Sequence, residues 1–176
     1  MERIAYHLCI AATRALQLSS REVVTPLQIT EGFSLAGDVV VVPVLRAGLS
    51  LLHAFTHLIP GSKIGYIGLK RNEETLEPFE YYCNIPELSS SSSVIILDPM
   101  LATGGSICAS VQELKSQGAK HIVVASVIAA PEGIARVESE HPDVAIICAT
   151  LDESLNDDGY IVPGLGDAGD RAHGTL

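Results

Sequence analysis

Short apolar runs alternate along the chain with segments whose apolar residues recur at helical spacing. Three of the runs contain no charged residue and are rich in β-branched side chains: Val39–Val44, Val94–Leu97 and Ile122–Val127. Runs of this kind are typical of strands buried on both faces. We predict a strand at each of them, and further strands at 63–69 and at Val144–Cys148.

The intervening segments predict helices. Apolar residues recur with a helical period over 2–17 and over 49–59, where Pro60-Gly61 would end the helix. Two more helices are expected at 105–117 and 132–140. Alternation of short strands with helices predicts an α/β fold, a largely parallel twisted sheet flanked by helices, in a single domain over 1–176. Ligands of such sheets bind at the carboxyl ends of the strands.

One polar segment interrupts this alternation. Residues 70–80 are expected to fold back as a flexible hairpin or loop toward Tyr81–Asn84. The serine run Ser89–Ser93 is too short for an interdomain linker and is predicted to be a loop.

Composition and net charge limit the kinds of partner that the protein is expected to bind. The 176 residues include 11 Lys and Arg against 21 Asp and Glu, a net charge of -10, while apolar residues make up 47% and charged residues 18%. An acidic chain repels phosphate polymers, so we expect no nucleic acid partner and no anionic membrane, and the apolar runs are too short to span a bilayer. The apolar excess suggests a subunit interface.

Cysteine spacing points to a reducing compartment. Cys9, Cys83, Cys108 and Cys148 form no CxxC pair, which favours reduced thiols and a cytoplasmic protein. The apolar stretch Leu8–Ala12 lacks the features of a signal peptide.

The segment after the second apolar run carries the most chemistry. It places Asp98 at the end of a predicted strand and continues Pro-Met-Leu-Ala-Thr-Gly-Gly-Ser up to Ser106, where a helix begins. Gly104 and Gly105 would let the backbone approach an anion, and N–H groups at a helix start bind phosphate. Asp98 could accept hydrogen bonds from ribose hydroxyls. An ordinary N-cap with turn glycines explains the same spacing equally well.

Other nucleotide-binding and catalytic motifs are either absent or lack the sequence context that they need. The sequence contains no GxxxxGK[ST] and no GxSxG motif. Gly164, Gly166 and Gly169 match GxGxxG, but too little chain follows them to form a βαβ unit. His53 and His57 have metal-ligand spacing without an evident third ligand, which favours ordinary packing or surface histidines.

Four segments in order resemble uracil phosphoribosyltransferases, members of the type I phosphoribosyltransferase family. They are Pro43–Gly48 (PVLRAG), Ile67–Arg71 (IGLKR), Asp98–Ser106 (DPMLATGGS) and Tyr160–Arg171 (YIVPGLGDAGDR). The resemblance implies transfer of phosphoribosyl from 5-phosphoribosyl 1-diphosphate (PRPP) to uracil, giving UMP and diphosphate in pyrimidine salvage. It also implies Mg2+ held through PRPP rather than by direct protein ligands, a possible GTP effector, and a homodimer or higher homo-oligomer.

The resemblance also assigns residues. Arg46, Arg71 and Asp167 would act in catalysis at the diphosphate and the PRPP–metal region. Uracil would be bound by Ile161, Gly166, Asp167 and Ala168, largely through backbone groups. PRPP would contact Arg46, Arg71 and Asp167 together with Asp98, Pro99, Met100, Leu101, Ala102, Thr103, Gly104, Gly105 and Ser106.

Physical chemistry supports these assignments. Displacement at the anomeric carbon passes through an oxocarbenium-like state while charge accumulates on the departing diphosphate, which arginines and a metal stabilise. Main-chain N–H and C=O groups can match the edge of a planar lactam and reject a base with another edge. A loop carrying Arg71 could close over PRPP and exclude water.

The chain departs from the resemblance in three places, one of which is the serine run Ser89–Ser93, which replaces a more charged loop. Members usually begin with a further N-terminal arm of a few tens of residues, and this chain starts near its end; Lys70 stands where an aromatic residue is common. The main alternative is a non-catalytic relative that binds uracil, UMP or PRPP as a regulator or partner subunit. A second alternative is an RNA-binding regulator on the same fold, which would need a basic face. A third is an enzyme of the same class that uses another base.

Overall fold

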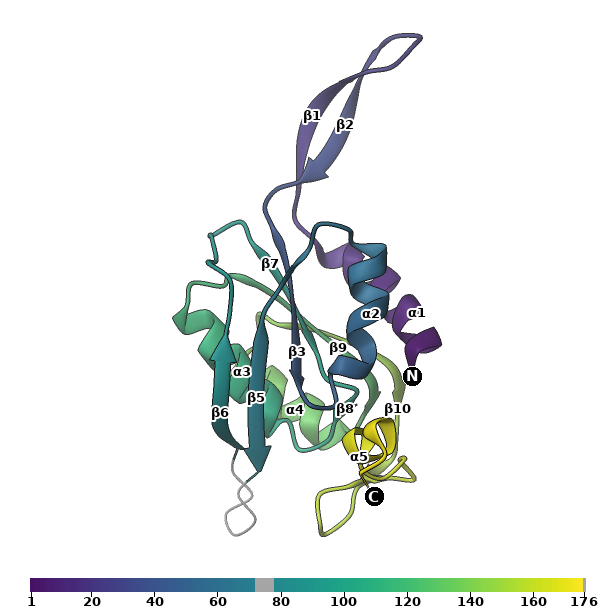
Figure 1. Cartoon of the computed structure of the whole chain (residues 1–176), viewed down its shortest axis with the longest axis vertical. Helices are drawn as coiled ribbons and strands as arrows, with labels where there is room; N and C mark the ends of the chain where they lie inside the picture. The colour runs from purple at the N-terminus through teal and green to yellow at the C-terminus, as the bar shows by residue number, and fades with distance from the viewer. Residues whose placement is uncertain (72–77, 176) are drawn as a thin grey trace.

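The computed structural model describes residues 1–71 and 78–175, without the side chains of Arg71 and Pro78. The central part of the predicted flexible loop, 72–77, therefore lies outside the described residues. The described chain forms a mostly parallel sheet of order β10-β9-β7-β3-β5-β6, which confirms the predicted α/β class (Figure 1). Its strands are β3 (Val39–Leu45), β5 (Tyr66–Arg71), β6 (Pro78–Asn84), β7 (Ser93–Leu97), β9 (His121–Ala129) and β10 (Ala145–Leu151).

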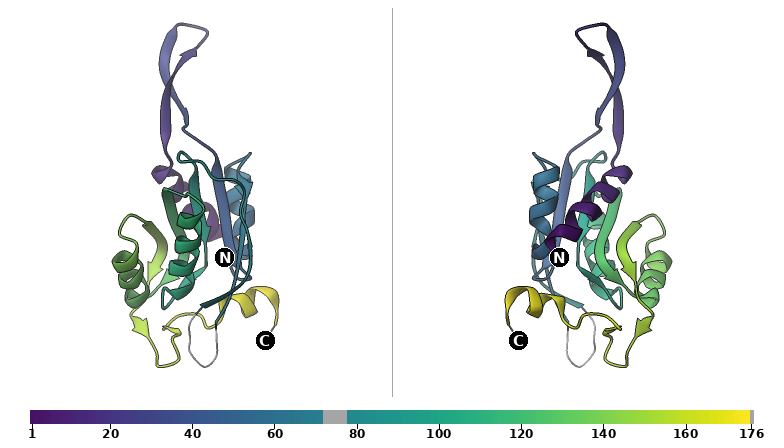
Figure 2. Two further views of the ribbon diagram at one scale, coloured as in Figure 1. Left: turned by 90° about the vertical axis from the view of Figure 1, so that its left-hand side faces the viewer. Right: turned by 90° about the vertical axis from the view of Figure 1, so that its right-hand side faces the viewer.

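Helices cover both faces of this sheet (Figure 2). α1 (Glu2–Ala12), continued by the short helix η1 (Thr13–Ala15), and α2 (Leu49–Leu58) lie on one face. α3 (Gly105–Ser116) and α4 (Pro131–Glu140) lie on the other. Each of these helices coincides with a predicted one to within a few residues.

Side-chain alternation in β3 explains why its sequence is apolar throughout. Val40 and Val42 pack with residues of α3 and α4, whereas Val39 and Val41 pack with residues of α1 and α2. Successive side chains of a strand point to opposite faces, so a strand covered by helices on both faces has no polar positions. The expectation of a strand buried on both faces is confirmed.

The region 63–84 differs in detail from the prediction. The single strand expected at 63–69 is interrupted at Gly65, which separates β4 (Lys63–Ile64) from β5. A Cβ atom at Gly65 would come within 2.7 Å of Ile85 Cδ1, so the segment after β6 lies close to the chain at this break. β6 then folds back antiparallel to β5, as expected for a hairpin.

A second hairpin was not predicted. β1 (Leu18–Val24) and β2 (Ile29–Leu35) pair antiparallel with each other and project away from the body of the molecule (Figures 1 and 2). Its apolar side chains are largely exposed, among them Leu27 at 94% and Phe33 at 68%. With neither face buried, the segment lacks the continuous apolar run that marked the interior strands.

The C-terminal part crosses the carboxyl end of the sheet. After β10, the chain forms a small antiparallel pair, β11 (Ser154–Leu155) and β12 (Ile161–Val162), and ends in α5 (Ala168–His173). Another short strand, β8 (Met100–Leu101), pairs with β9. The glycines that match GxGxxG lie around this last helix rather than in a βαβ unit.

Two simpler expectations can be compared with the structure. All four cysteines are free thiols; Cys9 and Cys108 are buried, and the other two are half-buried. In the part of the chain that the structure describes, every helix is too short or too polar to cross a membrane.

Candidate active site

The carboxyl ends of β3, β5 and β7 open onto a cavity of about 510 Å³. It brings together all four of the segments that carry the family resemblance, which are far apart in the sequence. The cavity is lined by Val44, Leu45, Arg46, Ala47, Leu69, Lys70, Tyr81, Asp98, Ser106, Asp167 and Gly169. Two basic and two acidic side chains therefore face the same space.

A neighbouring cavity of about 560 Å³ reaches the C-terminal loop. Its lining includes Met100, Ala102, Tyr160 and Ala168. Ala47, Lys70, Asp98, Asp167 and Gly169 line both cavities. Together the two spaces join the predicted PRPP residues to part of the predicted uracil segment.

The loop after β7 leads directly into the N-terminus of α3. Gly104 has φ 79° and precedes the first residue of α3. Gly104 is the N-cap of α3, as the alternative interpretation of this loop expects, and no side-chain hydrogen bond from the described residues caps the helix there. The N–H groups of the first helical turn lack intrahelical partners and carry the positive end of the helix dipole. A small cavity of about 30 Å³, lined by Asp98 and 100–107, lies against them.

Helix α4 fixes the shape of this loop. A Cβ atom on Gly133 would come within 2.2 Å of the Ala102 carbonyl oxygen, and one on Gly104 within 2.9 Å of the Gly133 carbonyl oxygen. Only glycine allows backbones to approach this closely. The loop therefore rests directly on the main chain of α4.

Asp98 has the most perturbed acidity among the residues of this site. Burial raises its pKa from 3.8 to about 7; a hydrogen bond from the Met100 N–H opposes this rise, and the charge of Asp167 adds to it. The carboxyl is thus poised between its two protonation states near neutral pH. A cation or hydrogen-bond donors at this position would favour the charged form.

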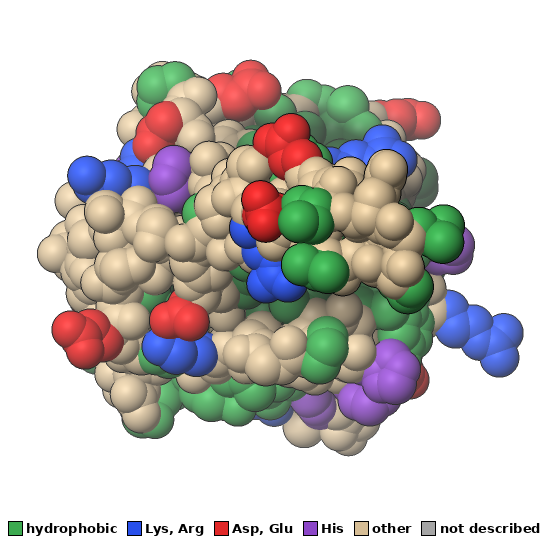
Figure 3. All heavy atoms as spheres, turned by 90° about the horizontal axis from the view of Figure 1, so that it is seen from above, with side chains coloured by type: hydrophobic (Ala, Val, Ile, Leu, Met, Phe, Trp, Pro, Cys, Tyr) green, Lys and Arg blue, Asp and Glu red, His purple; other side chains and the backbone are tan. Residues whose placement is uncertain are grey.

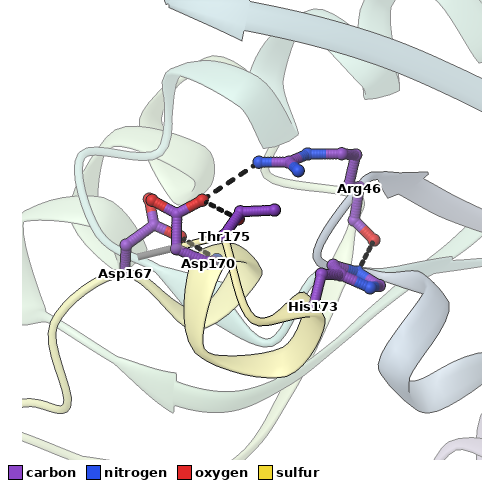
Figure 4. A network of polar contacts seen from close by, with 5 residues as sticks. All are labelled: Arg46, Asp167, Asp170, His173 and Thr175. Carbon is purple, nitrogen blue, oxygen red and sulfur yellow. Dashed lines mark hydrogen bonds and ion pairs between the residues drawn. The ribbon is translucent and has the colours of Figure 1, made fainter.

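Arg46 stands in the turn between β3 and α2. A side chain at Gly48 would come within 2.3 Å of the Leu97 carbonyl oxygen, so this turn packs tightly on β7. The Arg46 guanidinium forms an ion pair with Asp170 of α5, with 3.1 Å between Nη2 and Oδ1 (Figure 4). The Arg46 side chain is 54% exposed, which leaves it accessible to a ligand.

The C-terminal segment presents backbone groups more than side chains. Ile161 is buried with Ile128 and Ala130, so its side chain faces the protein interior. Asp167 is the N-cap of α5, where its Oδ1 accepts a hydrogen bond of 2.8 Å from the Asp170 N–H. Gly166 has φ 73°, a conformation that favours glycine.

Some predicted site residues lie outside these cavities. Pro99, Ile161 and Gly166 do not line any of the three described above. Arg71 is the last residue of β5, and its side chain is outside the described residues.

Other lining residues were missed by sequence reasoning. Lys70 was noted only as a departure from the family pattern, and Tyr81 depends on the register of the β5–β6 hairpin. The spacing of Asp167 and Asp170 is typical of a helix start in which the N-cap accepts from the backbone N–H three residues on, but this pattern does not place the Asp170 side chain at the cavity.

The donor set of the site fits a hard divalent cation. The carboxylates of Asp98 and Asp167 line the same two cavities, and oxygen atoms are the ligands that Mg2+ prefers. The raised pKa of Asp98 has the charge of Asp167 among its causes, and a cation between these groups would relieve that repulsion.

The chain is similar over nearly its whole length to a protein family, to curated relatives and to a solved structure. A family model described as uracil phosphoribosyltransferase matches residues 1–175. A uracil phosphoribosyltransferase of Clostridium botulinum strain Hall is 51% identical over 99% of this chain and 84% of its own length. A solved protein of Aquifex aeolicus is 42% identical with a TM-score of 0.87, covering 97% of this chain and 82% of that one. A hypoxanthine-guanine phosphoribosyltransferase of Bacillus anthracis, 13% identical with a TM-score of 0.55 over 74% of this chain and 67% of that one, shares the fold.

Proposed function

We propose roles for the individual site residues from the premise that this chain belongs to the uracil phosphoribosyltransferase family. The protein is an enzyme that transfers the phosphoribosyl group of PRPP to uracil, giving UMP and diphosphate. The observation that carries the residue assignment is the convergence of Arg46, Asp98, Ser106 and Asp167 on one cavity.

The 5-phosphate and ribose of PRPP are assigned to the loop between β7 and α3. Free N–H groups of the first turn of α3, beside Gly104, would bind the phosphate. Asp98 would accept hydrogen bonds from the ribose hydroxyls, and the hydroxyl groups of Thr103 and Ser106 would add donors. The close packing of Gly133 against this loop supports the assignment, because it holds the donors in place without ligand.

Arg46 is assigned to the leaving diphosphate. Charge builds up on the diphosphate as the glycosidic carbon becomes cationic, and a guanidinium positioned there stabilises that charge only as it develops. We assign Arg71 the same role, from the resemblance and its place at the end of β5.

Uracil is assigned to the space beside the C-terminal loop. Ile161, Gly166 and Ala168 would offer main-chain groups, and Asp167 would contact both substrates. The loop is braced on each side: the Gly164 N–H donates to Asp152 Oδ2 at 2.9 Å, and Arg171 Nη1 donates to the Leu165 carbonyl at 2.8 Å. A braced backbone can discriminate between bases because a wrong edge leaves polar groups unpaired.

Magnesium is assigned to the diphosphate of PRPP, with Asp98 and Asp167 nearby. When bound, the cation neutralises charge on the leaving group. The two carboxylates would orient the PRPP–metal complex, and ionisation of Asp98 would accompany its binding.

The test is direct. Purified protein given PRPP, magnesium and labelled uracil is expected to yield UMP, and no product at any enzyme concentration would reject the proposal. Binding of PRPP without turnover would instead favour the non-catalytic alternative. Cytosine, hypoxanthine and guanine in competition with uracil test the base assignment, and preferred use of any of them would overturn it.

The β1–β2 hairpin supports a homo-oligomer of this chain. A two-stranded hairpin alone is at most marginally stable in water, yet this one exposes Leu27, Ile29 and Phe33 and pairs only within itself among the described residues. Figure 3 views the molecule from the hairpin end and shows hydrophobic side chains at the surface. We assign this apolar surface to contact with a second copy, in line with the apolar excess of the composition.

Substitution in the hairpin tests this assignment. Phe33→Ser with Leu27→Ser is expected to shift the mass in solution from dimer or larger toward monomer. Ser19→Ala with Ser34→Ala, which changes an exposed hydroxyl pair in the same hairpin, serves as the control. A wild-type monomer at micromolar concentration would contradict the assignment.

Cytoplasmic location, a single domain over 1–176 and a GTP effector complete the proposal. The first rests on the absence of paired cysteine motifs in the sequence, the second on a length of 176 residues that suits one compact domain, and the third on the family resemblance alone. Turnover measured with and without GTP tests the effector.

A further inference from the structure

We infer that Asp170 is a positioning residue that holds Arg46 toward the cavity and links it to the helix carrying Asp167. This inference rests on the proposed role of Arg46 and goes beyond it, because Asp170 belongs to none of the assigned substrate contacts. The two residues are 124 positions apart in the chain. Their contact joins the turn after β3 to the C-terminal helix α5 (Figure 4).

The first argument is the geometry of the ion pair. Arg46 Nη2 donates to Asp170 Oδ1 at 3.1 Å. A guanidinium has five N–H donors in a planar fork, so a contact through one nitrogen leaves most of them available. The half-exposed side chain can therefore bind diphosphate while Asp170 still holds one end of it. This geometry orients the arginine without blocking it.

The second argument is that Asp170 is itself held in place. Thr175 Oγ1 donates to the same Oδ1 atom at 2.6 Å, and the Asp170 N–H donates to Asp167 Oδ1 at 2.8 Å. The hydrogen bonds from Thr175 and Arg46 lower the pKa of Asp170, which keeps it ionised at neutral pH. A carboxylate fixed by its neighbours can fix a flexible arginine in turn.

The third argument is that α5 contacts the backbone of Arg46 as well. His173 Nε2 donates to the Arg46 carbonyl oxygen at 3.2 Å (Figure 4). Both ends of the arginine are thus attached to the short helix that Asp167 caps. A displacement of α5 would move Arg46 and Asp167 together, so the diphosphate and base regions are aligned by one element.

The experiment measures PRPP and uracil kinetics for Asp170→Asn and Asp170→Ala. Asp170→Asn keeps an acceptor oxygen and is expected to raise KM for PRPP about twofold to threefold. Asp170→Ala is expected to raise it about fivefold, as for a partly exposed ion pair. KM for uracil and the melting temperature are expected to stay near wild-type values. Glu138→Gln removes one exposed negative charge on α4 and is the matched control. It is expected to leave KM for PRPP, KM for uracil and the melting temperature unchanged.

A double-mutant cycle separates positioning from general damage. If Asp170 acts through Arg46, Asp170→Asn has no further effect on PRPP binding, measured by calorimetry, once Arg46 is alanine. Additive effects would overturn the inference, as would an equal rise of both KM values, which would indicate loss of α5. Failure of the wild type to form UMP would instead reject the proposed phosphoribosyl transfer to uracil. In that case PRPP binding by the Asp170 and Arg46 variants would still decide the role of Asp170.

Discussion

Asp98 is the residue whose environment departs most from that of a surface carboxylate. Burial raises its pKa to about 7 although the Met100 N–H donates to it, so further partners from a ligand would favour its charged form. Because ribose hydroxyls and a nearby cation both favour the ionised carboxylate, PRPP binding is expected to release a proton near neutral pH.

The pH dependence of PRPP affinity tests this account of Asp98. The dissociation constant of the protein for magnesium–PRPP is expected to rise about tenfold from pH 8 to pH 6. Below the pKa of Asp98 its protonated form dominates, and a proton must then be released for the ligand to bind. PRPP also titrates, so Asp98→Asn is the control for its contribution. An identical pH profile in the variant would contradict the prediction.

The same shift has a consequence for stability. The folded state binds a proton at Asp98 more tightly than the unfolded state, whose pKa is near 3.8. The stabilisation is complete below pH 3.8 and is lost as the pH rises toward 7. Asp98→Asn is expected to flatten this part of the stability profile in denaturant titrations, and an unchanged slope would argue against the raised pKa.

Residues within one continuous motif could be predicted, and residues that depend on packing could not. Asp98 follows a recognisable strand, and Ser106 lies in the first turn of the helix after it. Their location at the carboxyl end of the sheet therefore follows from local sequence. Lys70 and Tyr81 reach the cavity only through the register of a hairpin. Asp170 reaches Arg46 only because α5 packs across the sheet edge, which no local pattern encodes.

At the scale of elements, α4 shapes the loop between β7 and α3 through a glycine, Gly133. Helix propensity alone predicts that Gly133→Ala stabilises α4 by about 1 kcal/mol. The structure predicts the opposite, because the new Cβ would lie 2.2 Å from the Ala102 carbonyl oxygen. We expect a loss of about 2 kcal/mol in the free energy of unfolding and weaker PRPP binding.

A substitution on the exposed side of the same helix provides the comparison. Glu138→Ala introduces the same residue without a backbone clash and is expected to change stability by less than about 0.5 kcal/mol. Thermal and denaturant unfolding of both variants decides between propensity and packing. A Gly133→Ala protein more stable than wild type would refute the packing account.

The elements that could be predicted are those buried on both faces. β3, β7 and β9 have nearly continuous apolar sequences because helices cover them from both faces. The β1–β2 hairpin escaped prediction because its apolar side chains are exposed in the chain by itself. A signal did exist at its turn, where Thr25 accepts from the Leu27 and Gln28 N–H groups beside a proline.

At the scale of the whole molecule, a net charge of -10 argues against a phosphate-rich substrate. The site resolves this conflict locally through Arg46, Lys70 and the helix N-terminus, which face the cavities directly. Contacts of this kind act over a few ångströms, whereas the field of distant carboxylates is screened beyond about 8 Å at physiological salt. The global charge therefore counts against nucleic acid but not against PRPP.

Arg46→Ala tests the central claim, that this cavity carries out the transfer. Wild-type enzyme is expected to form UMP from uracil, PRPP and magnesium. The variant should turn over about a hundredfold more slowly, the cost of losing one charge-stabilising donor, with an unchanged melting temperature. Arg14→Ala, an exposed arginine after α1, is the control. UMP formation by Arg46→Ala at the wild-type rate would contradict the account.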